Sequence, residues 1–323
     1  MPSGAESPID PLVSAGSASG SEEFWIAAID QTWTQGRCVA SRQSWGMAQK
    51  QGRRLFASDR RDEEMVALCG NAASSAASML RNVSTLTRIV CRVTRERDAV
   101  SIETTVVLTR NALSVVTTPE LWADDDRLLQ RLSASAPQVS APIDQPLLWC
   151  HGSAAVLLHE AAGHAAEHGA PRESWPQWLC VEDRSKDGSA DLLAGQIPLA
   201  LRRESFSDVP LPRMTSVVVE QSGAPFDLPE DRVDVLLVAG GAYDPITEEV
   251  TIHVAAAEAV RAGVSTAVRP FVLRASRSQV AAAMRGASGL PERYPGVICS
   301  REGQELYVSS AAPRILTRAF ATA

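Results

Sequence analysis

The sequence predicts an α+β protein: a mixed N-terminal α/β domain, then a buried helix, then a mostly antiparallel, β-rich C-terminal domain. Three observations favour this class. The chain has 323 residues, enough for roughly two domains of about 150 residues each. Short runs rich in β-branched residues, separated by glycine, proline and aspartate, dominate the second half. One long apolar segment at residues 147–169 stands before them.

The chain is expected to begin with a disordered tail over residues 1–22. These residues are rich in serine, glycine, alanine and proline, and they offer too little apolar surface to offset the entropy of ordering. The N-terminal domain then covers residues 23–146. It ends in the sequence APIDQP, residues 141–146, which has the composition of a domain linker.

Four secondary-structure elements are predicted inside this domain. Residues 62–81 form a helix that opens with acidic side chains. Residues 86–96 and 99–111 have the β-branched content of two paired strands. A second helix is expected over residues 119–136, because Pro119 stands at its start and acidic residues fill its first turns.

The segment at residues 147–169 has its apolar side chains nearly all round, which is typical of a buried helix. Ser153 is its candidate N-cap, and Gly169 is its candidate stop at C′. With this helix begins a C-terminal domain over residues 147–323. The predicted strands are SVVVEQ, RVDVLLVAG, EVTIHVAAA, AVRPFVLRA, GVICS, ELYVSS and RILTRAF.

Two connections in this half have turn chemistry. The sequence YDPITEE, residues 243–249, is typical of a tight connection between strands. The pair Gly240 and Gly241 lacks the spacing of a dinucleotide-binding loop, and we expect a turn or a bulge there.

The charge balance limits the partners of the protein. A formal net charge of −7 gives no general electrostatic attraction to a phosphate backbone, so nucleic acid is not an expected partner.

No apolar stretch approaches the roughly 18 residues of a membrane span, and the N-terminus lacks a signal peptide. The six cysteines form no CxxC pair. A cytoplasmic protein with free thiols and no membrane contact is therefore expected.

Histidine is concentrated in the predicted buried helix. Four of the five histidines, His151, His159, His164 and His168, fall within 18 residues. His159 and Glu160 begin an HExxxH arrangement that ends at His164. Two histidines and a glutamate close together on one helix are typical of a metal site with a general base. A less specific interpretation is that these histidines cap or line the helix without a metal.

The five-residue spacing has a geometric consequence. Residues five apart on a regular helix point about 140° away from each other, whereas residues four apart differ by about 40°. His159 and His164 can therefore face one metal only if the helix is widened, as by a π-type bulge. Gly163 is the residue best suited to an irregular backbone. Glu160 would then lie beside the metal without binding it, placed to accept a proton from water.

An overlapping pattern gives a second possible pair. His164, Glu167 and His168 form HxxEH, whose four-residue spacing needs no bulge. Either pair leaves the site incomplete, because a catalytic zinc usually has three protein ligands. The residues themselves do not decide the third ligand. The candidates are Cys299, His253, Cys180, Glu167, Glu220 and Asp183.

The sequence HEAAGH, followed three residues later by Glu167, resembles the signature of the TldD/PmbA (modulator of DNA gyrase) family of metalloproteases. The resemblance continues through PRMTSVVVEQSG, GGAYDPITEEVTIHVAAAEAVRAG and GVICSREGQELYVSSAAPRI, and it covers residues 147–320. It implies that His159, His164 and Cys299 bind Zn²⁺ and that Glu160 is the general base. The HExxxH, which PmbA-type (TldE) partners lack, implies a TldD-like, zinc-bearing chain with a shortened N-terminal region.

The resemblance also implies a function. We expect a zinc-dependent hydrolase that cleaves an amide or peptide bond in a peptide or a peptide-derived natural product. A PmbA/TldE-like partner would complete a heterodimer, with a homodimer as the other possibility. The alternative is a non-catalytic partner or regulatory subunit with a structural zinc, whose shell would be closed by a fourth ligand such as His168 or Asp183. The acidic stretch usual after the zinc helix is replaced here by VEDRSKDGSADLL.

Overall fold

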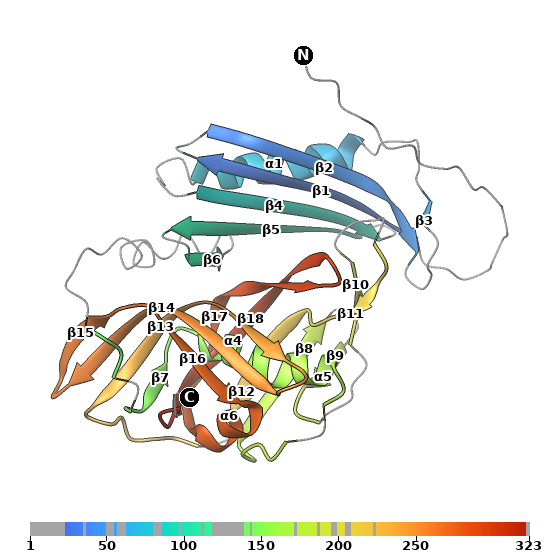
Figure 1. Ribbon diagram of the computed structural model, residues 1–323. Coiled ribbons are helices and arrows are strands. Elements are labelled where there is room, and N and C mark those ends of the chain that lie inside the picture. The colour runs from blue at the N-terminus through green and yellow to red at the C-terminus, as the bar shows by residue number, and fades with distance from the viewer. Residues whose placement is uncertain are drawn as a thin grey trace.

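The protein is built around two β-sheets and one central helical segment (Figure 1). In the computed structural model, the described residues are 23–34, 37–49, 55–56, 63–79, 86–96, 99–110, 113–117, 139–142, 144–170, 173–185, 188–194, 199–203, 208–221 and 224–320. The predicted tail and the predicted helix at residues 119–136 lie outside these residues. The described elements are mostly strands.

The N-terminal half forms a six-stranded sheet in the order β3-β2-β1-β4-β5-β6. Every pairing in it is antiparallel, so the sheet is not of the parallel α/β kind. Its strands are β1 (Glu23–Thr34), β2 (Arg37–Gln49), β3 (Leu55–Phe56), β4 (Leu86–Glu96), β5 (Ala99–Arg110) and β6 (Leu113–Thr117). The expected strands at 86–96 and 99–111 are thus confirmed, whereas β1 and β2 were not predicted.

One helix, α1 (Glu63–Met79), lies along β1 and β4 of this sheet, as predicted for residues 62–81. Cys69, Ala73 and Ala76 recur at helical spacing and are buried, and Ile29 and Ile89 of the sheet are buried as well. The edge strand β6 contacts β13 and β17 of the C-terminal half. Figure 1 shows the two sheets one above the other.

The C-terminal half forms a ten-stranded sheet in the order β15-β14-β13-β7-β18-β12-β8-β9, with β16 paired to β14 and β17 to β18. Two pairings are parallel, β7 with β13 and β12 with β18, and the others are antiparallel. The strands are β7 (Leu147–Trp149), β8 (Leu179–Ser185), β9 (Gly188–Asp191), β12 (Ser216–Gln221), β13 (Arg232–Asp244), β14 (Glu249–Arg261), β15 (Val264–Val268), β16 (Phe271–Ser276), β17 (Met284–Arg301) and β18 (Gln304–Thr317). A short separate pair joins β10 (Leu201–Arg202) to β11 (Leu211–Pro212).

Several features of this half differ from the sequence prediction. Residues 147–149, the start of the predicted helical segment, form the strand β7. The run ELYVSS and the start of the run RILTRAF belong to one strand, β18. The run AVRPFVLRA is not one strand. It is interrupted at Arg269 and Pro270, and β15 and β16 pair separately with β14. A short helix, α6 (Arg277–Ala283), follows, and it was not predicted. Its signal was present in the sequence, since Ser276 and Gln279 form a capping box across its first turn.

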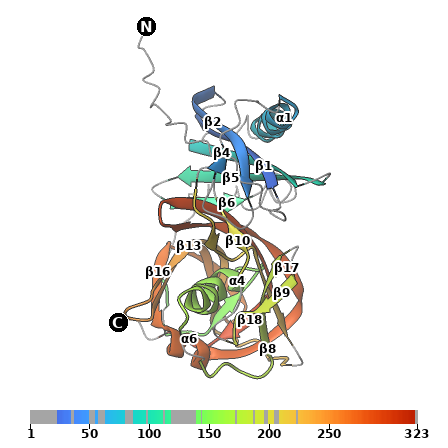
Figure 2. The same ribbon diagram turned by 90° about the vertical axis from the view of Figure 1, so that its right-hand side faces the viewer.

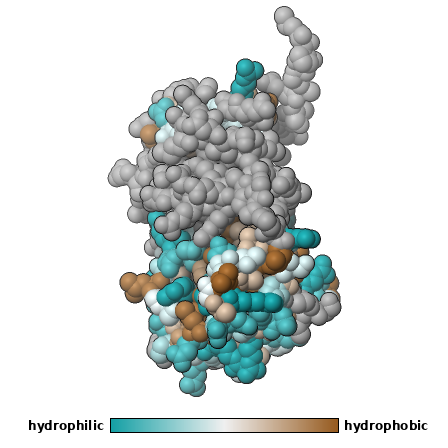
Figure 3. All heavy atoms as spheres, turned by 90° about the vertical axis from the view of Figure 1, so that its left-hand side faces the viewer, coloured by the Kyte–Doolittle hydropathy of each residue, from teal (hydrophilic) through white to brown (hydrophobic). Residues whose placement is uncertain are grey.

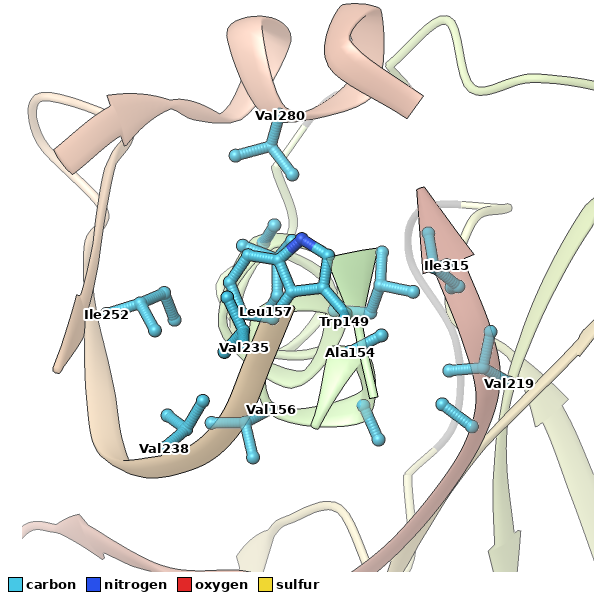
Figure 4. Packing of buried hydrophobic residues seen from close by; sticks show 14 of the residues in the cluster. Trp149, Ala154, Val156, Leu157, Val219, Val235, Val238, Ile252, Val280 and Ile315 are labelled. Atoms are coloured by element: carbon cyan, nitrogen blue, oxygen red, sulfur yellow. The ribbon is translucent and has the colours of Figure 1, made fainter. Parts of the chain in front are cut away.

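The central helical segment runs through α4 (Ala154–Leu158), η1 (His159–His164) and α5 (Ala165–Glu167). Figure 2 shows the strands of the C-terminal sheet curling round α4. Figure 4 shows Val156 and Leu157 beside Val235, Val238 and Ile252 of the strands, and all five are buried in one core. This all-round burial confirms the prediction made from the apolar pattern.

Of the two predicted ends of this segment, the N-cap is wrong and the C-terminal stop is confirmed. Ser153 is not a side-chain cap: its backbone is helical (φ −59°), and its hydroxyl donates to the carbonyl of Val235 at 3.2 Å. Gly169 is the stop, with φ +66°. The amides of Gly169 and Ala170 donate to the carbonyls of Ala166 and Ala165, which is the Schellman pattern.

Figure 3 shows one face on which apolar side chains are interspersed with hydrophilic ones. Among the described residues, no helix has the length and apolar character needed to cross a bilayer.

Candidate metal centre

The five-residue spacing of the two histidines is accommodated by a π-helix. Residues His159–His164 form η1, which lies between two pieces of ordinary α-helix. The wider turn brings the two imidazoles to the same side, with ring centroids 4.8 Å apart and planes at 90°. The guanidinium of Arg277 donates to the carbonyl of Ala161 at 3.1 Å, inside the widened turn. The predicted local widening of the helix is therefore confirmed.

Gly163 is needed for a different reason from the one predicted. Its φ is not among the positive values, so the turn does not require a glycine backbone. A Cβ at this position would instead lie 2.0 Å from the Sδ of Met214. The thioether packs directly on the helix backbone, and only glycine leaves that space open.

The third member of the cluster comes from a distant strand. Cys299 of β17 is buried, and its Sγ lies 2.7 Å from Nε2 of His159 and 3.4 Å from Nε2 of His164. The three donor atoms all lie within 4.8 Å of one another, and among the described residues they form the one group of this kind. The other candidates for a third ligand do not join it: His253, Cys180, Glu167, Glu220 and Asp183.

The second histidine pair is also not formed, because His168 points elsewhere. Its ring lies 6.3 Å from that of Tyr243 on β13, outside the cluster. His151 is half exposed, and its Nδ1 lies 3.5 Å from a carboxylate oxygen of Glu292. Of the four clustered histidines, His159 and His164 are thus the two that the structure brings together with Cys299.

The electrostatics of the two imidazoles differ. Burial, with the nearby positive charges of His164 and Arg213, holds the pKa of His159 well below its usual value. This histidine is therefore neutral, as a metal ligand must be. Burial alone would also lower the pKa of His164, but the contacts with Cys299 and Glu167 raise it well above its usual value.

Glu160 lies inside the protein beside these donors. Burial raises its pKa to about 7. Its Oε2 lies 3.6 Å from Nε2 of His164 and has no hydrogen-bond partner. A buried carboxylate oxygen without a partner is costly, so its place next to the donor atoms calls for a function.

The residues fit a zinc ion. Two imidazole nitrogens and one thiolate are donors that Zn²⁺ binds well, and three protein ligands are the usual number in a catalytic site. The unpartnered oxygen of Glu160 is where a group interacting with the ion would be expected. His164 also donates its other ring nitrogen, Nδ1, to Oε2 of Glu167 at 2.8 Å, as metal-binding histidines commonly do. A His159-His164-Cys299 cluster that could hold a metal ion is thus present.

The absence of a side chain at Gly241 of β13 leaves the space for Glu160, next to an irregular part of this strand. The register with β14 shifts between Val238 and Gly240, so the predicted bulge is present. At Gly241 a Cβ would lie 2.6 Å from Cγ of Glu160 and 2.8 Å from the carbonyl of Thr251. The carboxylate side chain therefore lies directly on this strand.

Comparisons with known proteins place the fold. No family model matches the sequence, and no curated protein matches it either. TldE from Thermococcus kodakarensis aligns over 92% of this chain and 96% of its own, with a TM-score of 0.50 and 9% identity. The chain has the fold of TldE. A candidate modulator of DNA gyrase from Bacteroides thetaiotaomicron aligns over 93% of each chain, with a TM-score of 0.45 and 8% identity.

Sequence reasoning missed several residues around the cluster. Arg213 and Arg277 are fully buried. Because 29 of the 31 basic residues are arginine, the residue type alone did not distinguish these two from the others. Met214 had no signal of its own, and the pair Gly240 and Gly241 predicted a bulge but not the contact with Glu160. The PRMT sequence, residues 212–215, carries part of the family resemblance but has no motif that points to a metal site.

Proposed function

We propose that the protein is a zinc-dependent hydrolase that cleaves an amide or peptide bond. The observation that carries this proposal is the convergence of His159, His164 and Cys299 beside the buried, unpartnered carboxylate of Glu160. The fold shared with TldE agrees with the family resemblance of the sequence.

In this proposal His159, His164 and Cys299 hold the ion. When bound, zinc supplies Lewis acidity, which activates water and polarises the carbonyl that is attacked. Glu160 accepts the proton of the attacking water at Oε2 and then returns it to the leaving amine. A pKa of about 7 suits this exchange, because the carboxyl group can accept and release a proton near neutral pH.

The strand next to Glu160 suggests how a substrate is held. On β13, only residues Val233–Val235 pair with β7. Among the described strands, the stretch from Gly240 to Asp244 is therefore paired with β14 alone. An extended peptide can add to such a strand edge through backbone hydrogen bonds. A peptide or a peptide-derived natural product is therefore the substrate class we propose.

The number of donors favours a catalytic over a structural zinc. A structural site is closed by four protein ligands. Of the two residues considered for the fourth place, His168 faces Tyr243, and Asp183 accepts hydrogen bonds from the amides of Thr215 and Ser216. Neither belongs to the cluster. The alternative of a non-catalytic subunit with a structural zinc has less support.

We also propose a two-chain assembly, either a heterodimer with a TldE-like partner or a homodimer. Mixing the purified chain with a TldE-like protein and measuring the mass of the complex by light scattering distinguishes the two. A complex with the mass of one chain of each kind supports the heterodimer, whereas a mass of two identical chains in the absence of partner supports the homodimer.

The test of the function is turnover with and without Glu160. The wild-type chain is incubated with a panel of peptides, alone and with a TldE-like partner, and the products are identified by mass spectrometry. Glu160→Gln keeps the shape of the side chain but cannot accept the proton, so turnover is expected to fall by about 10²–10⁴-fold while zinc content stays unchanged. Glu220→Gln, at an exposed glutamate on β12, is the control. Full activity in Glu160→Gln would remove Glu160 from the mechanism.

A further inference from the structure

Glu167 links the histidine on the helix to a second segment of the chain. Its side chain is fully buried. One carboxylate oxygen, Oε2, accepts the hydrogen bond from Nδ1 of His164 at 2.8 Å, and the other, Oε1, accepts the amide of Met214 at 3.1 Å. Met214 also packs on Gly163, the residue directly before His164 in the HExxxH. Both carboxylate oxygens of Glu167 are therefore held in place, one by the side chain of His164 and the other by the backbone of Met214.

Arg213, the neighbour of Met214, links Glu167 to the cysteine. The guanidinium is fully buried, and its Nε lies 3.6 Å from Oε1 of Glu167. Its Nη2 donates to the backbone carbonyl of Cys299 at 2.8 Å. One side chain thus contacts the residue that supports His164 and the backbone of the third donor. A second cation, Arg301, has its Nη1 3.8 Å from Oε2 of Glu167 at the edge of this group.

The chemistry of these contacts suggests what they do. A carboxylate that accepts a hydrogen bond from the Nδ1–H group keeps the lone pair of the imidazole on Nε2, the atom that faces Sγ of Cys299. Cys299 lies on a strand that is far from the helix in sequence. A link between its backbone and the helix would hold the thiol in place beside the two imidazoles. A buried ion pair often adds little to stability, so stability alone does not account for the contact between Arg213 and Glu167.

We infer that Glu167 and Arg213 are the positioning residues of the metal centre: Glu167 fixes the orientation and tautomer of His164, and Arg213 ties that carboxylate to the backbone of Cys299. This inference rests on the metal site of the proposed function. It extends that function by assigning the role of the PRMT segment, which holds the helix donor and the strand donor in one arrangement.

The test measures metal binding directly. Zinc affinity of the full-length chain is determined by competition with a chelating dye, and Co²⁺ is added separately because its visible absorption reports ligand geometry. In Glu167→Gln the amide can donate to Nδ1 and place the imidazole proton on Nε2, where it blocks the metal. We expect zinc to bind about 10–100-fold more weakly, with a weaker and shifted cobalt spectrum.

Arg213→Lys is the second variant, and it answers the case in which Glu167→Gln fails to fold. It keeps the positive charge next to Glu167 but lacks the forked donors of the guanidinium, so the link to Cys299 is lost. We expect an altered cobalt spectrum and weaker zinc binding, with a smaller effect than at Glu167.

Asp183→Asn is the matched control. Asp183 is also a buried carboxylate, and it holds the amides of Thr215 and Ser216 just after the PRM residues, but it touches none of the three donors. Its replacement is expected to lower thermal stability and leave zinc affinity and the cobalt spectrum unchanged.

Two results would overturn the inference: zinc affinity and cobalt spectra like those of the wild type in both variants, or an equal loss in Asp183→Asn. The proposed function fails in a different way. A wild-type chain that binds zinc, loses it in these two variants and cleaves no substrate would refute the hydrolase and keep the positioning role.

Discussion

The Cγ of Glu160 occupies the space that a side chain at position 241 would need: a Cβ built on Gly241 lies 2.6 Å from it. This contact joins the helix that carries the proposed general base to the strand that forms one wall of the site. It explains why a glycine stands in the middle of β13, where it would otherwise weaken the strand.

Gly241→Ala is expected to reduce turnover by about 10–100-fold, because displacing a catalytic group by about 1 Å has an effect of that size. Zinc content should stay unchanged, since the three atoms nearest to the added Cβ belong to Glu160, Thr251 and Ile252 and not to a donor residue. Gly70→Ala is the control: its Cβ would meet only Ile29, at an ordinary 3.9 Å, so activity should be retained and helix α1 stabilised. Wild-type activity in Gly241→Ala would show that Glu160 does not depend on this contact.

The contact between Gly163 and Met214 predicts a non-additive pair of mutations. Gly163→Ala places a Cβ 2.0 Å from Sδ of Met214, and it should displace Met214 together with the amide that binds Glu167. Zinc retention is expected to fall. Met214→Ala in the same chain removes the clash and should restore part of the zinc content, measured by elemental analysis after dialysis. Simple addition of the two single effects would contradict this account.

The hydroxyl of Tyr294 supports the irregular part of β13. It accepts the amide of Val238 at 2.7 Å and donates to the carbonyl of the same residue at 2.9 Å, next to the bulge. Tyr294→Phe leaves both backbone groups of Val238 buried without this partner. We expect a loss of about 1–3 kcal/mol in the free energy of unfolding, measured by urea denaturation. A loss below about 0.5 kcal/mol would show that the hydroxyl is not needed.

The thiol of Cys150 is expected to resist alkylation. Burial, reinforced by the charge of Asp234, raises its pKa to about 12. At pH 8 only about one molecule in 10⁴ then carries the reactive thiolate, and this fraction grows tenfold with each pH unit up to the pKa. Cys38 is exposed and should be labelled first. Peptide mapping after native treatment with iodoacetamide checks this order, and equal labelling of both thiols would contradict it.

The parts of the site that lie within one helix could be predicted from sequence. The spacing of His159 and His164 required a widened turn, and the structure has a π-helix over those residues. The burial of the helix and its end at Gly169 also followed from local patterns, because periodicity and capping depend on near neighbours in the chain.

The contacts between distant segments could not be predicted in the same way. Nothing in the residues separated Cys299 from the other third-ligand candidates, since the choice depends on how β17 lies against the helix. The role of Gly163 depends on Met214, 51 positions later, and the space at Gly241 depends on Glu160. Such contacts are set by the topology of the sheet, which single-sequence patterns do not encode.

The central claim is that one zinc ion is held by two imidazoles and one thiolate, and X-ray absorption at the zinc edge tests it most directly. The purified protein is predicted to contain about one zinc per chain, with one sulfur at about 2.3 Å and two imidazole nitrogens at about 2.0–2.1 Å. In Cys299→Ser the sulfur contribution should disappear. A chain without zinc, or a shell that lacks sulfur in the wild type, would contradict the account.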